Sequence, residues 1–240
     1  MITRKDTPTV MPFMRPLGEL DDADPSVVGS KAATLGRLRA AGFPVPDGFV
    51  VSGLAVSGLE RPEIRGAVAA ALDTLGSGPV AVRSSAAAED LADASFAGQY
   101  ESVLGVNGLE DVLAAIGDVL RSAESERVAR YRSGKDTDGA SSAVAVLVQR
   151  MVPAEVAGVA FTADPVTGDR DVVVVSAVRG LGDRLVSGEA GADEWVVQAG
   201  SASRRRAVED VLDASLAEDV AALARRVEAH EGGPQDIEWA

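Results

Sequence analysis

Short apolar runs and helix-spaced apolar positions follow one another along this 240-residue chain and predict a mixed α+β fold. Apolar side chains at helical spacing predict helices at residues 26–41, 62–75, 109–132 and 215–229. Continuous apolar runs bounded by turn residues predict strands at residues 49–51, 80–82, 143–152, 156–162 and 172–178. Because helices and strands do not alternate strictly, the pattern favours α+β over a doubly wound sheet.

A polar loop at residues 135–142 interrupts this pattern between a predicted helix and a long apolar strand. A chain of this length can form one large domain or two small ones. We therefore expect a first unit at residues 1–138 and a second at residues 139–240.

Composition narrows the classes of ligand. Hydrophobic residues make up 46% of the chain and aromatic residues only 4%, so the core must consist of Val, Leu and Ala. The net charge of -14 argues against a nucleic-acid binder and against docking to an anionic membrane. An anionic ligand would need a local basic pocket and a metal ion.

The absence of cysteine excludes disulfides, and with no apolar leader or long apolar run we expect a cytoplasmic protein.

Arg83 follows the apolar run Val80–Val82 directly, and small hydroxyl residues come after it. A guanidinium is a permanent forked donor to phosphate, and small residues let backbone N–H groups approach anionic oxygens. A second small-residue motif at 95–99 strengthens the interpretation as a phosphate loop. The alternatives are a surface ion pair of Arg83 with Glu89 or Asp90, and ordinary turn chemistry.

Lys31 and Glu238 are the other charged candidates. Lys31 lies near the start of a predicted helix, where a cation is unfavourable unless an anion is present. Glu238 alternates with apolar neighbours on a predicted strand, and a carboxylate beside a nucleotide is a natural Mg²⁺ ligand. A solvated surface lysine and an outward-facing strand carboxylate are the alternatives.

Three further segments could contact the rest of a nucleotide. Residues 149–152 end a long apolar strand, as expected of an apolar slot for a base, or of a core strand that reaches the surface. Thr162 and Asp183 lie in glycine- and proline-containing stretches that also suit hairpin turns.

Together these segments resemble the N-terminal ATP-binding domain of the phosphoenolpyruvate synthase, pyruvate phosphate dikinase and rifampin phosphotransferase family. The resemblance runs in consistent order from about Leu17 to Ala240. The matching stretches are residues 29–35, 42–49, 82–85, 95–99, 148–152, 158–165, 180–183 and 234–239.

The resemblance implies an ATP-grasp fold, in which ATP lies between two α+β subdomains. It implies that Lys31 and Arg83 are catalytic and contact the phosphates, while the loop at 95–99 covers them. Asp183 stands where the family usually has Glu and implies a ribose contact, and Glu238 implies a Mg²⁺ ligand. The implied nucleotide-binding set is Lys31, Arg83, Ser84, Ser95, Phe96, Ala97, Gly98, Gln99, Gln149, Arg150, Met151, Val152, Thr162 and Asp183.

The chain departs from the family pattern at three points. The family continues into a strand of the form Leu-Gln-x-Arg-Pro, whose Gln binds metal and whose Arg contacts phosphate, and this sequence ends at Ala240. The stretch between Trp195 and Ser215 is shorter than usual. The family relays phosphate through a histidine on a separate domain, whereas His230 here lies in an amphipathic helix without that context.

The sequence therefore predicts the ATP-binding component of a split or truncated dikinase-like phosphotransferase. It would bind Mg-ATP and donate a pyrophosphoryl group to a histidine on a partner chain or domain, for phosphorylation of a small-molecule acceptor. The acceptor stays open, because in this family another domain selects it. The alternatives are a non-catalytic nucleotide-sensing or scaffold subunit, and a fragment of a longer enzyme.

Overall fold

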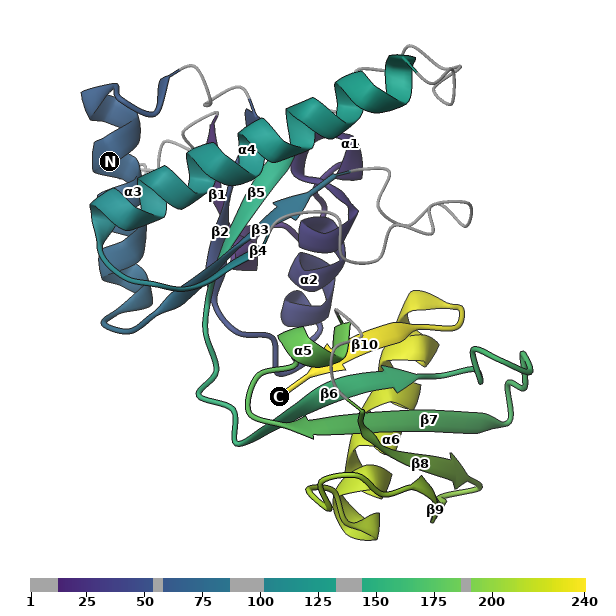
Figure 1. Cartoon of the computed structure of the whole chain (residues 1–240). Coiled ribbons are helices and arrows are strands. Elements are labelled where there is room, and N and C mark those ends of the chain that lie inside the picture. Colours follow the sequence, from purple (N-terminus) through teal and green to yellow (C-terminus); the bar gives the residue numbers. More distant parts are fainter. Residues whose placement is uncertain (1–12, 54–57, 87–101, 133–143, 187–190) are drawn as a thin grey trace, which may run out of the picture. The chain divides into compact units, whose positions relative to one another are not determined.

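The computed structural model describes residues 13–53, 58–86, 102–132, 144–186 and 191–240 (Figure 1). The chain divides into two compact units, one ending at Met151 and one beginning at Val152. We describe each unit by itself.

The first unit contains a five-stranded sheet in which every neighbouring pair of strands is antiparallel. The strand order is β1-β2-β5-β3-β4. The strands are β1 (Met14–Pro16), β2 (Gly48–Val51), β3 (Val80–Ser85), β4 (Ser102–Val106) and β5 (Ala145–Arg150). The helices are η1 (Leu17–Glu19), α1 (Pro25–Val28), α2 (Ser30–Ala40), α3 (Pro62–Leu75) and α4 (Leu109–Arg132).

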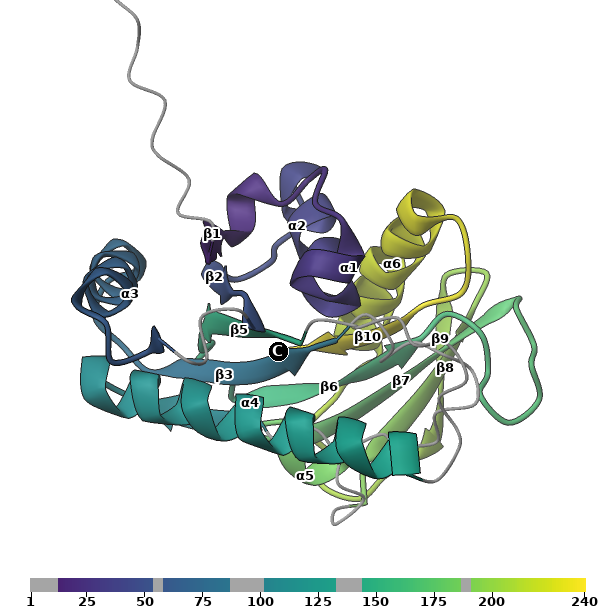
Figure 2. The same ribbon diagram turned by 90° about the horizontal axis from the view of Figure 1, so that it is seen from above.

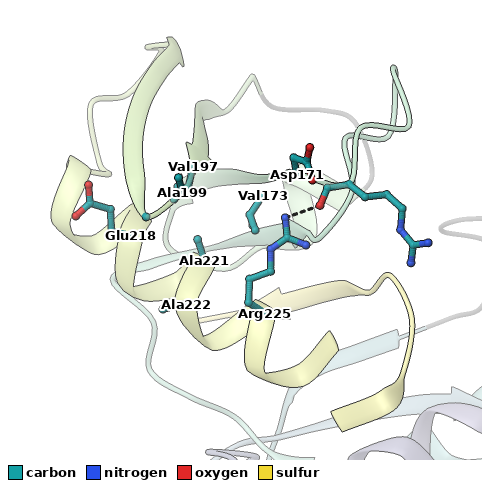
Figure 3. A pocket seen from close by; sticks show the side chains of 10 residues that line it. Asp171, Val173, Val197, Ala199, Glu218, Ala221, Ala222 and Arg225 are labelled. Atoms are coloured by element: carbon teal, nitrogen blue, oxygen red, sulfur yellow. Dashed lines mark hydrogen bonds between the residues drawn. The ribbon is translucent and has the colours of Figure 1, made fainter. Parts of the chain in front are cut away.

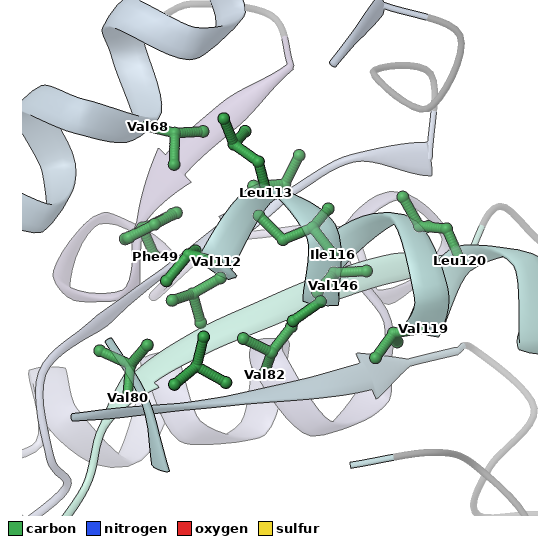
Figure 4. Close-up of a cluster of buried hydrophobic side chains, with 14 of the residues drawn as sticks. Phe49, Val68, Val80, Val82, Val112, Leu113, Ile116, Val119, Leu120 and Val146 are labelled. Atoms are coloured by element: carbon green, nitrogen blue, oxygen red, sulfur yellow. The ribbon is translucent and has the colours of Figure 1, made fainter. Parts of the chain in front are cut away.

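Helices cover both faces of this sheet, as Figure 2 shows for α2 and α4 on opposite sides of β3. Val82 and Val146 face α3 and α4, and Figure 4 shows them beside Ile116 and Leu120 of α4. On the other face, Leu147 packs with a group of apolar residues from η1, α1 and α2. Successive residues of a strand point to opposite faces, so these two clusters fix the face on which each residue of β3 and β5 lies.

The second unit contains another five-stranded antiparallel sheet, in the order β10-β6-β7-β8-β9. The strands are β6 (Val156–Phe161), β7 (Val172–Arg179), β8 (Asp193–Gln198), β9 (Ser201–Arg206) and β10 (Asp236–Trp239). One turn of helix, α5 (Asp183–Val186), follows β7, and α6 (Ala214–Glu231) packs on one face of the sheet. Asp213 caps the start of α6 and Gly232 ends it in the left-handed conformation.

The predicted α+β class is confirmed, since helices and two antiparallel sheets are both present. The apolar core consists almost entirely of Val, Leu, Ile and Ala, as the composition requires. The single helix predicted at 26–41 is wrong: Gly29 has a φ of 82° and separates α1 from α2. At the start of the chain, where β1 lies, the sequence allowed either a strand or a loop, and it did not predict β4, β8 or β9. Of these, β9 carries mostly exposed polar side chains and therefore has no alternating apolar pattern.

The division between the units falls after Met151, whereas the sequence placed it after residue 138. The physical reason is the pairing of β5, which is hydrogen-bonded to β2 on one side and β3 on the other. The polar loop at 135–142 lies outside the described residues, and the elements before and after it in the chain, α4 and β5, belong to the same unit.

Asp193, at the start of β8, is a buried carboxylate that organises the chain between β9 and α6. Its Oδ1 accepts the backbone N–H groups of Val208 (2.6 Å), Glu209 (3.0 Å) and Asp210 (3.2 Å), and its Oδ2 accepts that of Val211 (2.6 Å). Burial acts to raise the pKa of Asp193, but these four donors outweigh it and hold the pKa below its ordinary value.

We expect Asp193→Asn to destabilise the protein by about 2 kcal/mol or more at pH 7, because the amide NH₂ replaces one carboxylate oxygen and presents a donor instead of an acceptor to the N–H of Val211 or to the other three N–H groups. A lowered folded-state pKa gives stability that is complete above about pH 4 and is lost as pH falls through that pKa. Urea unfolding should therefore show a difference between variant and parent that shrinks toward pH 3. Asp219→Asn, at an exposed position of α6, is the matched control and should change little; an equal effect of both would contradict the assignment.

Candidate functional site

The N-terminus of α2 packs directly against the end of β3. The N–H of Ala32 donates to Oγ of Ser85 (3.1 Å), and the N–H of Ser30 donates to the carbonyl of Ala86 (3.2 Å). A Cβ atom on Gly29 would lie 2.2 Å from both the carbonyl oxygen and Oγ of Ser85. Only glycine allows this approach, and its positive φ starts the helix at this point.

Arg83 lies on the same face of the sheet as α2. It pairs in register with Leu147, and Ser85 pairs with Ala145, and both β5 residues belong to the cluster packed under α2. The motif at 83–85 and the motif at 29–31, which are separated by about fifty residues in sequence, are therefore brought to one place. The family resemblance implies that both motifs contact the phosphates, but nothing in the sequence indicates the direct hydrogen bonds between α2 and the end of β3.

Lys31 is the second residue of α2 and is half-buried. Among the described residues, no hydrogen bond or ion pair involves its ammonium group. The first turn of a helix carries a partial positive charge, so a lysine there is stabilised by an external anion. The surroundings of Lys31 thus have the positive charge of an anion site, while the N–H groups of Ser30 and Ala32 on either side of it are already bonded to Ala86 and Ser85.

Ser84 points to the opposite face of the sheet from Arg83 and Ser85. Strand alternation puts its side chain on the face of Val82, toward α4, and it is 4% exposed. Its contact with a nucleotide stays a prediction. The predicted loop residues Ser95, Phe96, Ala97, Gly98 and Gln99 lie outside the described residues.

The segment at 149–152 is held by the turn that precedes β2. The Gln149 side-chain amide donates to the carbonyl of Pro46 (2.9 Å), and the N–H of Arg150 donates to that of Asp47 (2.8 Å). The Arg150 guanidinium bonds to the Leu75 carbonyl. Met151 accepts the N–H of Gly105 at its sulfur (2.9 Å), and Val152 is 39% exposed. These bonds fix the backbone of the segment, and its contact with adenine stays a prediction.

Thr162 connects β6 to β10 in the second unit. It is fully buried, and its Oγ1 accepts the N–H of Gln235 (2.7 Å) while its own N–H donates to the Gln235 carbonyl (2.9 Å). Arg225 of α6 donates to the Thr162 carbonyl (2.8 Å). The structure therefore shows Thr162 positioning β10, and a direct ligand contact stays a prediction.

The turn after β6 is tied to β9 by Asp164, which is 4% exposed. Its Oδ1 accepts the N–H groups of Val166 and Thr167, and its Oδ2 pairs with Arg205 at 2.8 Å. The hydrogen bond from Arg205 is the main cause that holds the pKa of Asp164 below its ordinary value. The Asp164 carboxylate therefore serves to hold this turn in place against β9.

Glu238 and Asp183 are both exposed carboxylates of the second unit. Glu238 of β10 pairs with Val159 of β6. Its neighbours Ile237 and Trp239 pack toward α6, so the Glu238 side chain lies on the opposite face of the sheet. Asp183 begins α5. Within the described ranges, no group of three or more His, Asp or Glu side chains gathers as a metal site.

A hollow of about 420 Å³ lies between α6, the start of β7 and the end of β8, as Figure 3 shows. Val173, Val197 and Ala221 form its apolar lining, and Arg225 reaches across it to the carbonyls of Arg170 (2.8 Å) and Val172 (2.9 Å). Of the residues predicted to bind a nucleotide, none of those that the structure describes lines this hollow.

Comparison with known proteins matches residues 60–210 to the pyruvate phosphate dikinase AMP/ATP-binding domain. The chain belongs to this family. It is 39% identical to a rifampicin phosphotransferase of a Streptomyces species over 249 positions, covering 93% of this chain and 27% of that protein. It is 30% identical to a probable phosphoenolpyruvate synthase of Methanocaldococcus jannaschii over 303 positions, covering 96% of this chain and 26% of that protein.

The chain thus spans about a quarter of the length of these dikinase-family relatives. The family match includes Arg83, the segment at 149–152, Thr162 and Asp183, and it does not reach Lys31 or Glu238. In the described part of the chain, no helix has the length and apolar character needed to cross a membrane.

Gly29 was not among the predicted site residues, although a glycine followed by Ser-Lys inside a helical pattern was the available signal. We expect Gly29→Ala to cost about 3 kcal/mol or more, because the new Cβ clashes with Ser85 in addition to the strain of a positive φ. Gly42→Ala is a matched control, since Gly42 also has a φ of 82° but nothing within 4 Å of its Cβ position. It should cost about 1 kcal/mol. Equal costs in urea unfolding would contradict close packing at Gly29.

Proposed function

We propose that this chain is an ATP-grasp module that binds Mg-ATP as the ATP-binding component of a dikinase-like phosphotransferase. The observation that carries the proposal is the contact of the α2 N-terminus with the end of β3, which joins the segments of Lys31 and Arg83. Membership of the pyruvate phosphate dikinase AMP/ATP-binding domain family supports the nucleotide as ligand.

The phosphates are the part of ATP that this contact suits. Lys31 supplies a point charge at the positive end of α2, and Arg83 supplies a fork of N–H donors from the adjacent strand end. In a chain with a net charge of -14, such a local positive field is needed to bind a polyanion at all. Their role in transfer is to hold the phosphates and stabilise negative charge as it moves.

Glu238 is the proposed protein ligand of Mg²⁺. Mg²⁺ in nucleotide sites is commonly bound through one or two carboxylates together with phosphate oxygens and water. A single exposed carboxylate on β10 fits this mode, and the Thr162–Gln235 bonds hold the start of that strand. When bound, the metal would neutralise phosphate charge. Residues 149–152 are proposed for the adenine, and Asp183 for the ribose.

The proposed transfer uses a histidine outside this chain. The histidine nitrogen attacks the β-phosphorus of ATP, the bond from the β-phosphorus to the α–β bridging oxygen breaks, and AMP leaves with that oxygen. The histidine then carries a pyrophosphoryl group, whose terminal phosphoryl passes to water or inorganic phosphate and whose remaining phosphoryl passes to the acceptor. The relatives support this extension, because this chain matches only about a quarter of their length. His230 lies on α6, 39% exposed and near Glu231, and is not proposed as the carrier.

A second candidate is a nucleotide-sensing or scaffold subunit without transfer. Incubation with radiolabelled ATP and a histidine-bearing domain from a relative separates the two functions. Label on that domain supports transfer, and nucleotide binding without label supports sensing.

We expect Arg83→Ala and Lys31→Ala each to weaken binding of Mg-AMP-PNP at least tenfold, measured by isothermal titration, because each removes a charge from the phosphate site. Both variants should keep the circular dichroism spectrum of the parent. Arg121→Ala removes an exposed arginine of α4 that pairs with Asp118, and serves as the control for loss of one positive charge. Unchanged affinity in Arg83→Ala would contradict the site.

The proposed metal ligand has its own test. Glu238→Gln should reduce the gain in AMP-PNP affinity that Mg²⁺ provides, while affinity without Mg²⁺ stays the same or rises, because one negative charge near the phosphates is lost. Asp236→Asn removes an exposed carboxylate from the same face of β10 and should leave the Mg²⁺ effect unchanged. If the two variants respond alike, Glu238 is not the ligand.

A further inference from the structure

Ser85 is a buried polar residue that the proposed function has not used. It is 0% exposed, so its side chain cannot touch a nucleotide bound at the surface. Its Oγ is nevertheless the acceptor for the N–H of Ala32, which belongs to a helix that begins 55 residues earlier in the chain. Any influence of Ser85 on a ligand must therefore pass through the elements that it joins.

The elements joined are those that carry the two proposed phosphate ligands. Arg83 is two residues before Ser85 on the same face of β3, and Lys31 directly precedes Ala32 in the first turn of α2. The backbone bond from Ser30 to Ala86 lies on the other side of Lys31. Lys31 thus lies between Ser30 and Ala32, and these two residues contact Ala86 and Ser85, which follow Arg83 closely in the chain.

The hydrogen bond from Ala32 to Ser85 opposes separation of α2 from β3, because breaking it in this buried site leaves the Ala32 N–H without its acceptor. The absence of a side chain at Gly29 allows the elements to approach closely enough for this bond.

We propose that Ser85 is a positioning residue for phosphate binding: its hydroxyl fixes the first turn of α2 against β3, so that Lys31 and Arg83 engage the same polyphosphate. This inference rests on the proposed function, since it assigns Ser85 an effect on the Lys31–Arg83 site. A purely structural role would affect the binding of any ligand. The proposed role of Ser85 affects only the binding of the phosphates, and it does so by positioning Lys31.

The test compares AMP-PNP with adenosine, which lacks all phosphates, by titration of the full chain at a temperature where circular dichroism shows every variant folded. Ser85→Ala should weaken AMP-PNP about tenfold, the scale of one mispositioned charged contact, and leave adenosine within about twofold. An equal loss for both ligands, or no loss for either, would overturn the proposal.

Ser52→Ala is the matched control. Its Oγ is buried without a hydrogen-bond partner among the described residues, so removing this hydroxyl deletes no bond. The variant should bind both ligands as the parent does. Ser85→Cys supplies a second variant with a weaker acceptor of similar size, and should give a loss of AMP-PNP affinity between those of the parent and Ser85→Ala. An unchanged affinity in Ser85→Cys, if Ser85→Ala does not fold, would count against the proposal.

A double-mutant cycle gives the sharpest outcome. In the Lys31→Ala background, Ser85→Ala should weaken AMP-PNP by no more than about twofold, because the group that it positions is already absent. Fully additive losses would overturn the positioning role. If the parent chain does not bind AMP-PNP, the proposed function itself fails; if Lys31→Ala weakens binding but Ser85→Ala does not, only this inference fails.

Discussion

The close approach of α2 to the end of β3 is the contact on which the proposed site depends. It requires a residue without a side chain at Gly29 and an acceptor at Ser85, and a Cβ at the first would lie 2.2 Å from the second. Each residue alone looks ordinary in the sequence, one a glycine in a helical pattern and the other a serine after a strand. Together they bring the lysine and arginine motifs to one end of the sheet.

Buried polar contacts play a comparable part in the second unit, where the core is built from small side chains. Ala217, Ala221 and Ala224 of α6 let the helix lie close to its sheet but offer little directional restraint. Direction comes from hydrogen bonds: Arg225 reaches the carbonyls of Thr162, Arg170 and Val172. The β10 strand, which carries Glu238, is positioned by its pairing with β6, by Ile237 and Trp239 packed toward α6, and by the Thr162–Gln235 bonds that this network supports.

Charge explains why the candidate site must be local. The chain carries 37 acidic and 23 basic residues, so a polyanion is repelled by the molecule as a whole. A helix N-terminus, a half-buried lysine and an arginine on the neighbouring strand can reverse that sign only where they converge. The acidic surface would then favour nucleotide with bound Mg²⁺ over the free, more negative nucleotide.

The fold class, most strands and helices, and the motifs at 29–31 and 83–85 could be predicted from the sequence, because they follow from apolar periodicity and local turn chemistry. The strand β9 could not, since an exposed polar edge strand has no periodic signal. Three-dimensional contacts were needed to show that β5 belongs to the first unit, that Ser84 faces α4, and that Thr162 is buried under bonds to Gln235. They were also needed to show that Ser85 meets Ala32. These features rest on register and on contacts between residues far apart in the chain, where a shift of one residue would reverse the face of every side chain.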